Sequence, residues 1–231
     1  TGVAQGIKYI QEFNLKTYEQ NPVVVCSFGD NSITEGEVSE AFQFAALHQL
    51  PINFLVQDNE WGISVTKEEA RTSDAYDFAA GFVGLNRMKV DGTDFEASFE
   101  AMKKVVDFVR TERKPMLVCA STVLIGHHTS GVRREFYRDE EDLEKHRAKD
   151  PGILLRKRLL EEGTDEDLLK QIEKKARLEI EQAFQKAIAA EDPKPESVED
   201  YVFAPTPITE EVGEREGQNP EKIVMVDAAI H

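Results

Sequence analysis

Residues 23–30 read Val-Val-Val-Cys-Ser-Phe-Gly-Asp, and residues 51–59 read Pro-Ile-Asn-Phe-Leu-Val-Gln-Asp-Asn. Each is a short apolar run that ends in polar side chains, at Asp30 in the first and at Asn59 in the second. A helix-length stretch, 34–50, separates them. This spacing predicts two parallel strands, which need a crossover of about a dozen residues or more between them. We therefore expect Asp30 and Asn59 at the same edge of one sheet, where ligands bind in open α/β folds.

The rest of the first 121 residues continues the same alternation. Apolar segments at 88–90 and 116–121 predict two more strands. A short helix is expected at 74–84, before the first of them, and a longer helix that begins near Thr93 lies between the two. Four strands alternating with helices predict an α/β fold, a doubly wound parallel sheet flanked by helices on both faces. The pairs Thr34/Glu37 and Thr93/Glu96 predict capping boxes, and the polar stretch 66–74 predicts a loop.

The C-terminal third has a different character. Helices are expected from about residue 150, so that residues 1–190 form one α/β domain. Residues 191–220 are rich in Glu and Pro and predict an acidic linker. The apolar stretch 221–231 is interpreted as the start of a following domain that is cut off, and the first residues as a helix without a start signal. We thus expect an N-terminally truncated fragment of a longer polypeptide.

Composition excludes several classes of protein. The chain has 28 basic and 44 acidic residues, a net charge of −16, which argues against binding to nucleic acid or to an anionic membrane surface. No apolar run approaches the ~20 residues that a membrane-spanning helix needs. The two cysteines, Cys26 and Cys119, fall in predicted strands and are expected to be reduced, which favours a cytoplasmic protein.

The polar ends of the first two strands suggest a cation site. A carboxylate from Asp30 and an amide oxygen from Asn59 suit Mg²⁺, which takes few protein oxygens and completes its shell with phosphates and water. A backbone carbonyl just past Asn59, that of Trp61, is the expected third ligand. Gly29 is expected to let the chain turn sharply and approach the ligand. An isolated Asp and Asn more often only complete turns, so the surrounding motif decides the interpretation.

The segment Gly29-Asp30-Asn31-Ser32-Ile33-Thr34-Glu35-Gly36 resembles the thiamine diphosphate motif, a Gly-Asp-Gly run followed later in the chain by Asn. More narrowly, the chain is similar to the α subunit of the decarboxylating component of 2-oxo acid dehydrogenase complexes, of the pyruvate and branched-chain (2-oxoisovalerate) type. The resemblance runs from about residue 1 to 160. Further matching stretches are 50–52, 59–64, 90–94, 126–130 and 137–138.

The resemblance implies a thiamine-diphosphate-binding fold and an oxidoreductase that decarboxylates a 2-oxo acid and passes the acyl group to a lipoyl carrier. It implies thiamine diphosphate and Mg²⁺ as cofactors, with Asp30, Asn59 and Trp61 as the metal ligands. His128 is the expected catalytic histidine, with His127 as the alternative. The expected cofactor-binding residues are Gly29, Asp30, Asn31, Ser32, Asn59, Trp61 and Ile63.

The resemblance also implies partners. A β-type half, separate or fused, would complete the active site, and a lipoyl-bearing acyltransferase component would receive the acyl group. The expected assembly is a dimer of α–β pairs. Because the β half supplies part of the active site, we expect the isolated 231-residue chain to be inactive.

Several residues depart from the family pattern. Asn31 stands where the motif usually has Gly, Gln57 where relatives often place a diphosphate-binding Arg, and Leu124 where they place another loop Arg. Losing an Arg removes a charge-assisted bond to the diphosphate; Arg133 or Arg134 are candidates to replace it. Two alternatives stay open: another thiamine enzyme, transketolase-like or acetoin-cleaving, or a non-catalytic α/β binding module that has lost the site.

Overall fold

The computed structural model describes residues 1–202 of the chain. The expected domain start at 221–231, and the linker beyond residue 202, lie outside the described residues. The chain divides into two compact units, one of residues 1–173 and one that begins at Lys174. The predicted helices and strands up to residue 121 all lie in the first unit.

A four-stranded parallel sheet is the centre of the first unit. Its strands are β1 (Val24–Gly29), β2 (Ile52–Asp58), β5 (Asn86–Asp91) and β6 (Met116–Ser121), in the spatial order β1-β2-β6-β5. The register pairs Gly29 with Gln57, and pairs both Asp58 and Asp91 with Ser121. The carboxyl ends of all four strands are therefore level with one another, and the predicted parallel α/β sheet is confirmed.

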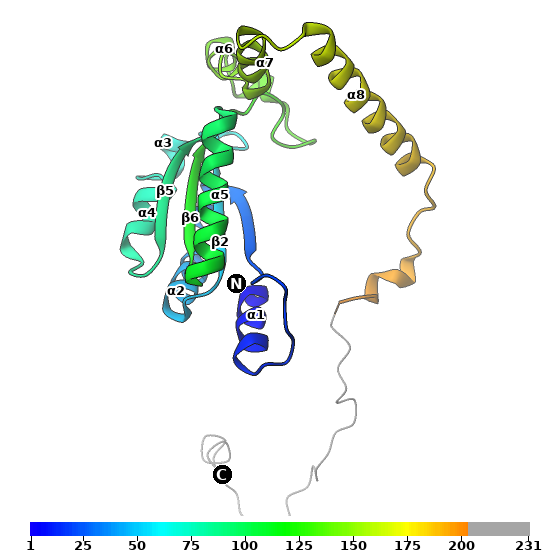
Figure 1. Cartoon of the computed structure of the whole chain (residues 1–231). Helices are drawn as coiled ribbons and strands as arrows, with labels where there is room; N and C mark the ends of the chain where they lie inside the picture. The colour runs from blue at the N-terminus through cyan, green and yellow to red at the C-terminus, as the bar shows by residue number, and fades with distance from the viewer. Residues whose placement is uncertain (203–231) are drawn as a thin grey trace, which may run out of the picture. The chain divides into compact units, whose positions relative to one another are not determined.

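Helices cover both faces of this sheet, as expected (Figure 1). On one face α5 (Phe95–Glu112) packs Val105 and Val109 against Val118 of β6. On the other, α2 (Gly36–His48) and α4 (Ala75–Phe78) pack around Phe42 and Phe54, whose ring centroids are 4.9 Å apart. Alternate side chains of each central strand thus enter different cores, which explains why these strands are apolar throughout.

The helix starts differ from the predicted capping boxes. The Thr34 hydroxyl donates to the carbonyl of Asn31 at 2.8 Å and closes a 3-10 turn, η1 (Asp30–Thr34), so that α2 begins only at Gly36 without a side-chain cap. At α5 the cap is Asp94, which accepts from the backbone N–H of Ala97 at 3.0 Å. Both predictions were wrong because a competing local hydrogen bond forms, made by Thr34 itself at α2 and by Asp94, the neighbour of Thr93, at α5.

The connection after β2 holds more structure than a loop. A short hairpin, β3 (Trp61–Gly62) with β4 (Val65–Thr66), leads into α3 (Lys67–Ala70). A capping box between Thr66 and Glu69 starts α3. The predicted loop at 66–74 is therefore wrong in its first half. The chain continues from α3 into α4, which η2 (Ala79–Gly81) follows directly.

The remaining elements are helical. They are α1 (Gly2–Glu12), η3 (Arg134–Phe136), α6 (Glu140–Arg147), α7 (Pro151–Glu161), α8 (Glu166–Ile188) and η4 (Pro195–Glu199). Asp150 caps α7, with Pro151 in its first turn, as predicted. The second unit begins within α8, and its described residues are all exposed.

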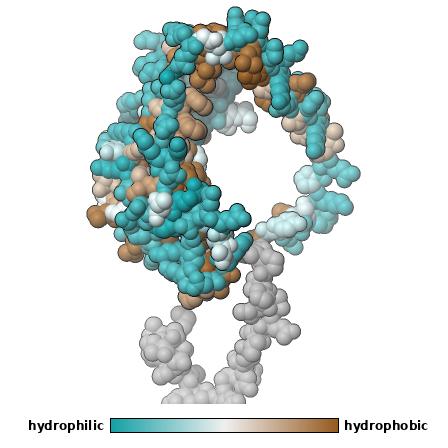
Figure 2. Space-filling view, in the orientation of Figure 1, coloured by the Kyte–Doolittle hydropathy of each residue, from teal (hydrophilic) through white to brown (hydrophobic). Residues whose placement is uncertain are grey.

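The surface in view is mostly hydrophilic, with separated apolar patches (Figure 2). No helix among residues 1–202 has the length and apolar character needed to cross a membrane. Cys26 and Cys119 are both free thiols; Cys119 is buried and Cys26 partly buried.

Candidate functional site

The two polar positions that the sequence analysis singled out lie at the same edge of the sheet. Asp30 directly follows β1 and opens η1; Asn59 directly follows β2. Because β1 and β2 are adjacent and Gly29 pairs with Gln57, the chain presents Asp30 and Asp58 at neighbouring strand ends, with Asn59 one residue further. The predicted placement at one strand edge is thus confirmed, while the roles of these side chains stay predictions.

A buried arginine joins the two strand ends. Arg71, just past α3, places its Nη2 atom 2.8 Å from Asp30 Oδ2 and 2.7 Å from Asp58 Oδ1. The side chains of Arg71 and Asp30 are 5% and 1% exposed, so this ion pair is shielded from water. Burial raises the pKa of Asp58, the Arg71 guanidinium opposes that rise, and the Asp30 carboxylate adds to it. One nitrogen thus forms ion pairs with the carboxylates that follow or end two neighbouring strands.

Asp30 still has an oxygen available for a cation. Its Oδ1 atom is buried and has no hydrogen-bond partner in the structure, and neither has Asn31 Oδ1. An orphaned buried carboxylate oxygen is costly unless a cation or water satisfies it. Beside it, a Cβ added at Gly29 would meet no atom within 4 Å, which leaves open space for a ligand. This edge therefore fits a Mg²⁺ ion with diphosphate oxygens.

Gly29 itself has an extended backbone, with φ −76°, which any residue adopts. The expected sharp glycine turn is therefore absent at Gly29, and the tight position is instead Gly62. A Cβ added at Gly62 would lie 2.8 Å from Asn31 Cγ and 3.0 Å from Asn31 Cβ, with the amide nitrogen closer still. The amide of Asn31, which stands where the motif usually has Gly, fills the space in front of Gly62 and joins η1 to β3.

The backbone around Trp61 is held in an unusual conformation. Glu60 and Ile63 have left-handed φ angles of 69° and 59°, which is rare for non-glycine residues and especially for a β-branched one. Asn59 Oδ1 accepts from the Trp61 N–H at 2.9 Å, and the Glu60 carbonyl accepts from the Lys67 N–H at 3.0 Å. Strained backbone of this kind persists where surrounding contacts enforce it, often at functional sites.

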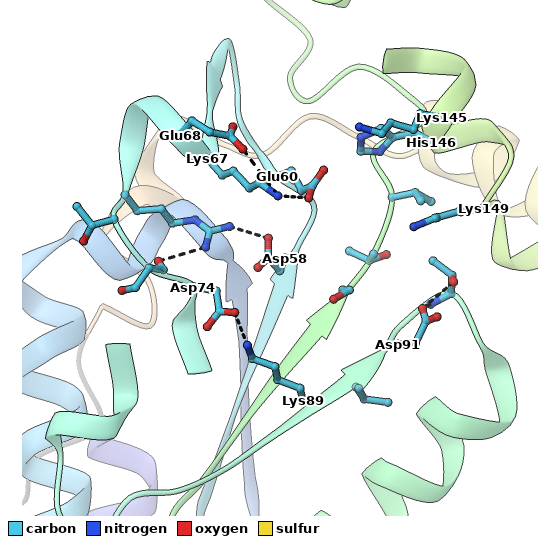
Figure 3. Close-up of a pocket in the computed structure, with 18 residues that line it drawn as sticks. Asp58, Glu60, Lys67, Glu68, Asp74, Lys89, Asp91, Lys145, His146 and Lys149 are labelled. Atoms are coloured by element: carbon cyan, nitrogen blue, oxygen red, sulfur yellow. Dashed lines mark hydrogen bonds and ion pairs between the residues drawn. The ribbon is translucent and has the colours of Figure 1, made fainter. Parts of the chain in front are cut away.

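A pocket of about 840 Å³ opens at the carboxyl ends of β2, β5 and β6 (Figure 3). On one wall stand Glu60, Lys67 and Glu68, and on the opposite wall Lys145, His146 and Lys149. Asp58 and Arg71 also line it, so the Asp30 ion pair borders this pocket. Its lining is polar and mixes both charge signs; the full set is Asp58, Glu60, Lys67, Glu68, Arg71, Thr72, Ser73, Asp74, Lys89, Val90, Asp91, Thr93, Ser121, Thr122, Val123, Lys145, His146 and Lys149.

His146 was not identified from the sequence. It is 5% exposed, and its Nδ1 accepts from the Leu124 N–H at 3.0 Å. Burial lowers the pKa of His146, with Arg138 adding to that effect, so the imidazole is held neutral with its proton on Nε2. His146 was missed because it sits in a charged helix whose pattern is that of a solvated face.

The two predicted catalytic histidines lie elsewhere. His127 and His128 are exposed on the loop between β6 and α6, where they line a separate hollow with Thr129, Ser130 and Arg133. His127 Nδ1 accepts from the Arg134 N–H at 3.3 Å. This hollow shares no lining residue with the larger pocket. The structure thus separates these histidines from the pocket above the strand ends, and their catalytic role stays a prediction.

Contacts from the same loop reach Trp61 instead. The Arg138 guanidinium lies 5.2 Å from the Trp61 ring centroid, and the Tyr137 ring lies 5.6 Å from it. Arg138 also donates to the Leu124 carbonyl at 2.5 Å.

Neither Arg133 nor Arg134 pairs with Asp30. The side chain that pairs with Asp30 is Arg71, which was not identified from the sequence because it follows a short helix that was not predicted. Among residues 1–202, no group of three or more His, Cys, Asp or Glu side chains has a metal-binding arrangement; a site made of one carboxylate, one amide and one carbonyl is not of that kind.

Similarity to known proteins identifies the family of this chain. The model of a family described as dehydrogenase E1 component matches residues 2–196. The chain belongs to the dehydrogenase E1 component family. The α subunit of the pyruvate dehydrogenase E1 component from Rickettsia conorii is 28% identical over 86% of this chain and 59% of its own length. The mitochondrial 2-oxoisovalerate dehydrogenase α subunit from Mus musculus is 30% identical over 83% of this chain and 44% of its own length.

This E1 family member therefore spans about half the length of the curated relatives that it matches. Among solved structures, transketolase from Campylobacter jejuni matches 52% of the chain at 22% identity, with a TM-score of 0.42. The predicted family is confirmed, and the E1 α subunits among its relatives are those of pyruvate and branched-chain 2-oxo acid dehydrogenases.

Proposed function

We propose that this chain is the diphosphate-anchoring part of a thiamine-diphosphate-dependent 2-oxo acid dehydrogenase of the pyruvate or 2-oxoisovalerate type. The observation that carries the proposal is the orphaned Oδ1 of Asp30, buried at the carboxyl edge of the sheet beside the strand that Asn59 follows, in a chain of the E1 family. Such an edge is where ligands of open α/β sheets bind.

In this proposal each residue of the edge has a limited task. Asp30 Oδ1, the Asn59 amide oxygen and the Trp61 carbonyl hold Mg²⁺. The open space at Gly29 admits the diphosphate, with Asn31, Ser32 and Ile63 around it. The Asn59–Trp61 hydrogen bond at 2.9 Å fixes the backbone that presents the Trp61 carbonyl.

Thiamine diphosphate, when bound here, would supply the electron sink that decarboxylation of a 2-oxo acid needs. The chain's own contribution is to anchor and orient. His128, or His127 beside it, would move a proton at an imidazole nitrogen.

The proposal includes partners that complete the enzyme. A β-type half, separate or fused, is expected to close the site, a lipoyl-bearing acyltransferase component to take the acyl group, and the assembly to be a dimer of α–β pairs. A cytoplasmic location is consistent with the two free thiols.

Calorimetry on the full-length protein tests the anchoring role. Thiamine diphosphate should bind in the presence of Mg²⁺ and lose most of its affinity in EDTA. Asp30→Asn should reproduce the EDTA result, whereas Asp77→Asn, an exposed carboxylate on α4, should leave binding unchanged. Turnover assays with 2-oxo acids and a lipoyl domain, against sugar phosphates, then identify the reaction. Equal affinity with and without the metal would overturn the proposal.

One observation favours the non-catalytic alternative. Arg71 already neutralises Asp30, and Gln57 supplies no positive charge where relatives often have Arg. A module that had lost the site would give no Mg²⁺-dependent heat with thiamine diphosphate, so the same titration separates the two functions.

A further inference from the structure

The Arg71 guanidinium occupies an unusual electrostatic position. It pairs with Oδ2 of Asp30, and the other oxygen of the same carboxylate, Oδ1, is the one available to a cation. Its second ion pair, to Asp58, comes from the neighbouring strand, and its Nη1 donates to the Ser73 carbonyl at 3.3 Å. Arg71 Nε is buried without a partner, so the side chain is held mainly by its two carboxylates.

Arg71 offsets half of the negative charge in this cluster before any metal binds. Asp30 and Asp58 contribute two negative charges and Arg71 one positive charge, which leaves a net charge of −1; Asp30 and Arg71 are shielded from water, and Asp58 is 14% exposed. Two buried carboxylates without Arg71 would repel each other and attract a divalent ion strongly. With Arg71 in place, a metal ion that binds Asp30 has two routes. It shares the Asp30 carboxylate with the Arg71 guanidinium, or it displaces the guanidinium and breaks the ion pairs of Arg71 with Asp30 and Asp58. Either route weakens metal binding.

We infer that Arg71 is a resident counter-cation that sets the divalent-metal affinity of the Asp30 edge: it keeps the metal-free site paired and competes with the ion for Asp30. This rests on the proposed function, because it presumes that the ion binds at Asp30. Arg71 is a positioning residue in this role; it acts on the ion through the Asp30 carboxylate. Metal and diphosphate together overcome the competition, since the diphosphate adds negative charge to the site.

Asp58 has the complementary part. Its carboxylate shares the Arg71 Nη2 atom with Asp30, at 2.7 Å and 2.8 Å respectively, so that the positive charge is divided between two carboxylates. An amide at position 58 keeps the acceptor oxygen and the shape but removes the charge. In the Asp58→Asn protein, Asp30 is the only carboxylate that pairs with Arg71, and the net charge of the cluster becomes more positive by one.

The test uses Mn²⁺ in place of Mg²⁺, with saturating thiamine diphosphate and the full-length protein, and counts bound ion from the loss of the free-ion EPR signal. Arg71→Met should tighten Mn²⁺ binding by about tenfold or more, because it removes a positive charge next to the ion in a site of low dielectric. Asp58→Asn should weaken it by about tenfold, for the opposite reason. Arg71→Lys keeps the charge and should stay within about threefold of the wild type.

The opposite directions separate this role from a structural one. If Arg71 only held the loop in shape, Arg71→Met and Asp58→Asn would both weaken Mn²⁺ binding, and that result overturns the inference while leaving the proposed metal site intact. If Arg71→Met does not fold, Asp58→Asn can still overturn the inference, because unchanged or tighter Mn²⁺ binding in that variant contradicts the competition. A wild-type protein that binds no Mn²⁺ with thiamine diphosphate rejects the proposed function and this inference together.

Discussion

The contact between Gly62 and Asn31 offers the most specific test of how this edge is built. An alanine at position 62 would bring its Cβ to 2.8 Å from Asn31 Cγ and 3.0 Å from Asn31 Cβ, both below normal contact distance. Asn31 is next to Asp30 in η1, and the contact reaches its Cβ as well as the end of its side chain. Overpacking of this kind costs about 1–3 kcal/mol, and we expect Gly62→Ala to lower the free energy of unfolding by that amount.

Three further variants separate the contact between positions 31 and 62 from a general effect of adding a methyl group. Asn31→Gly removes the obstructing amide, so the double variant Asn31→Gly/Gly62→Ala should recover most of the stability that Gly62→Ala loses. Gly29→Ala, the same substitution in open space at φ −76°, should leave stability unchanged within about 0.5 kcal/mol. Denaturant unfolding of the full-length protein measures all four, and the coupling between positions 31 and 62 follows from the double-mutant cycle. A Gly62→Ala protein as stable as the wild type, or a double variant no better than the single one, refutes the packing argument.

Two further predictions concern backbone strain and pH. Ile63 is 42% exposed and has a φ of 59°, so Ile63→Gly should relieve strain and raise the free energy of unfolding by about 0.5–1 kcal/mol despite the extra flexibility of glycine. Val65→Gly, a control at an exposed position in the adjoining β4, should lower the free energy of unfolding. If Ile63→Gly lowers the free energy of unfolding as well, no strain is stored at position 63. Burial lowers the pKa of His146 in the folded state. An unfolded chain therefore takes up a proton here first, and stability should fall as the pH drops below about 6.5, the ordinary histidine value. His146→Gln, which keeps an acceptor for Leu124 N–H but does not titrate, should lose less stability between pH 7.5 and 5.5; an identical loss in both proteins would assign the pH dependence to other groups.

The sheet was predictable because its physical signals are local. The runs at 23–28 and 52–56 are apolar on both faces, and the length of chain between them admits only a crossover, so their parallel pairing and the common edge of Asp30 and Asn59 follow. Helix starts were less predictable. Thr34 and Asp94 each take part in a local hydrogen bond that competes with the predicted cap, and patterns of residue types do not rank such alternatives.

The site was only partly predictable because its decisive contacts are non-local. Arg71 meets Asp30 across 41 positions of sequence, and nothing in the short turn that carries it indicates the partner. The approach of Asn31 to Gly62 is likewise a tertiary contact, although Asn in place of the usual motif glycine marked the position. His146 lies in a strongly charged helix, so its burial could not be inferred from periodicity.

The central claim is that Asp30 and Asn59 converge on a divalent ion next to Trp61, and fluorescence tests it most directly. Paramagnetic Mn²⁺ bound at the Trp61 carbonyl should quench the emission of that indole, which is isolated by subtracting a Trp61→Phe protein measured in parallel. In the presence of thiamine diphosphate we predict saturable quenching of the Trp61 emission by Mn²⁺, and we predict that this quenching is lost in both Asp30→Asn and Asn59→Ala. Trp61 emission that Mn²⁺ leaves unchanged, or that it quenches equally in Asp30→Asn, would contradict the account.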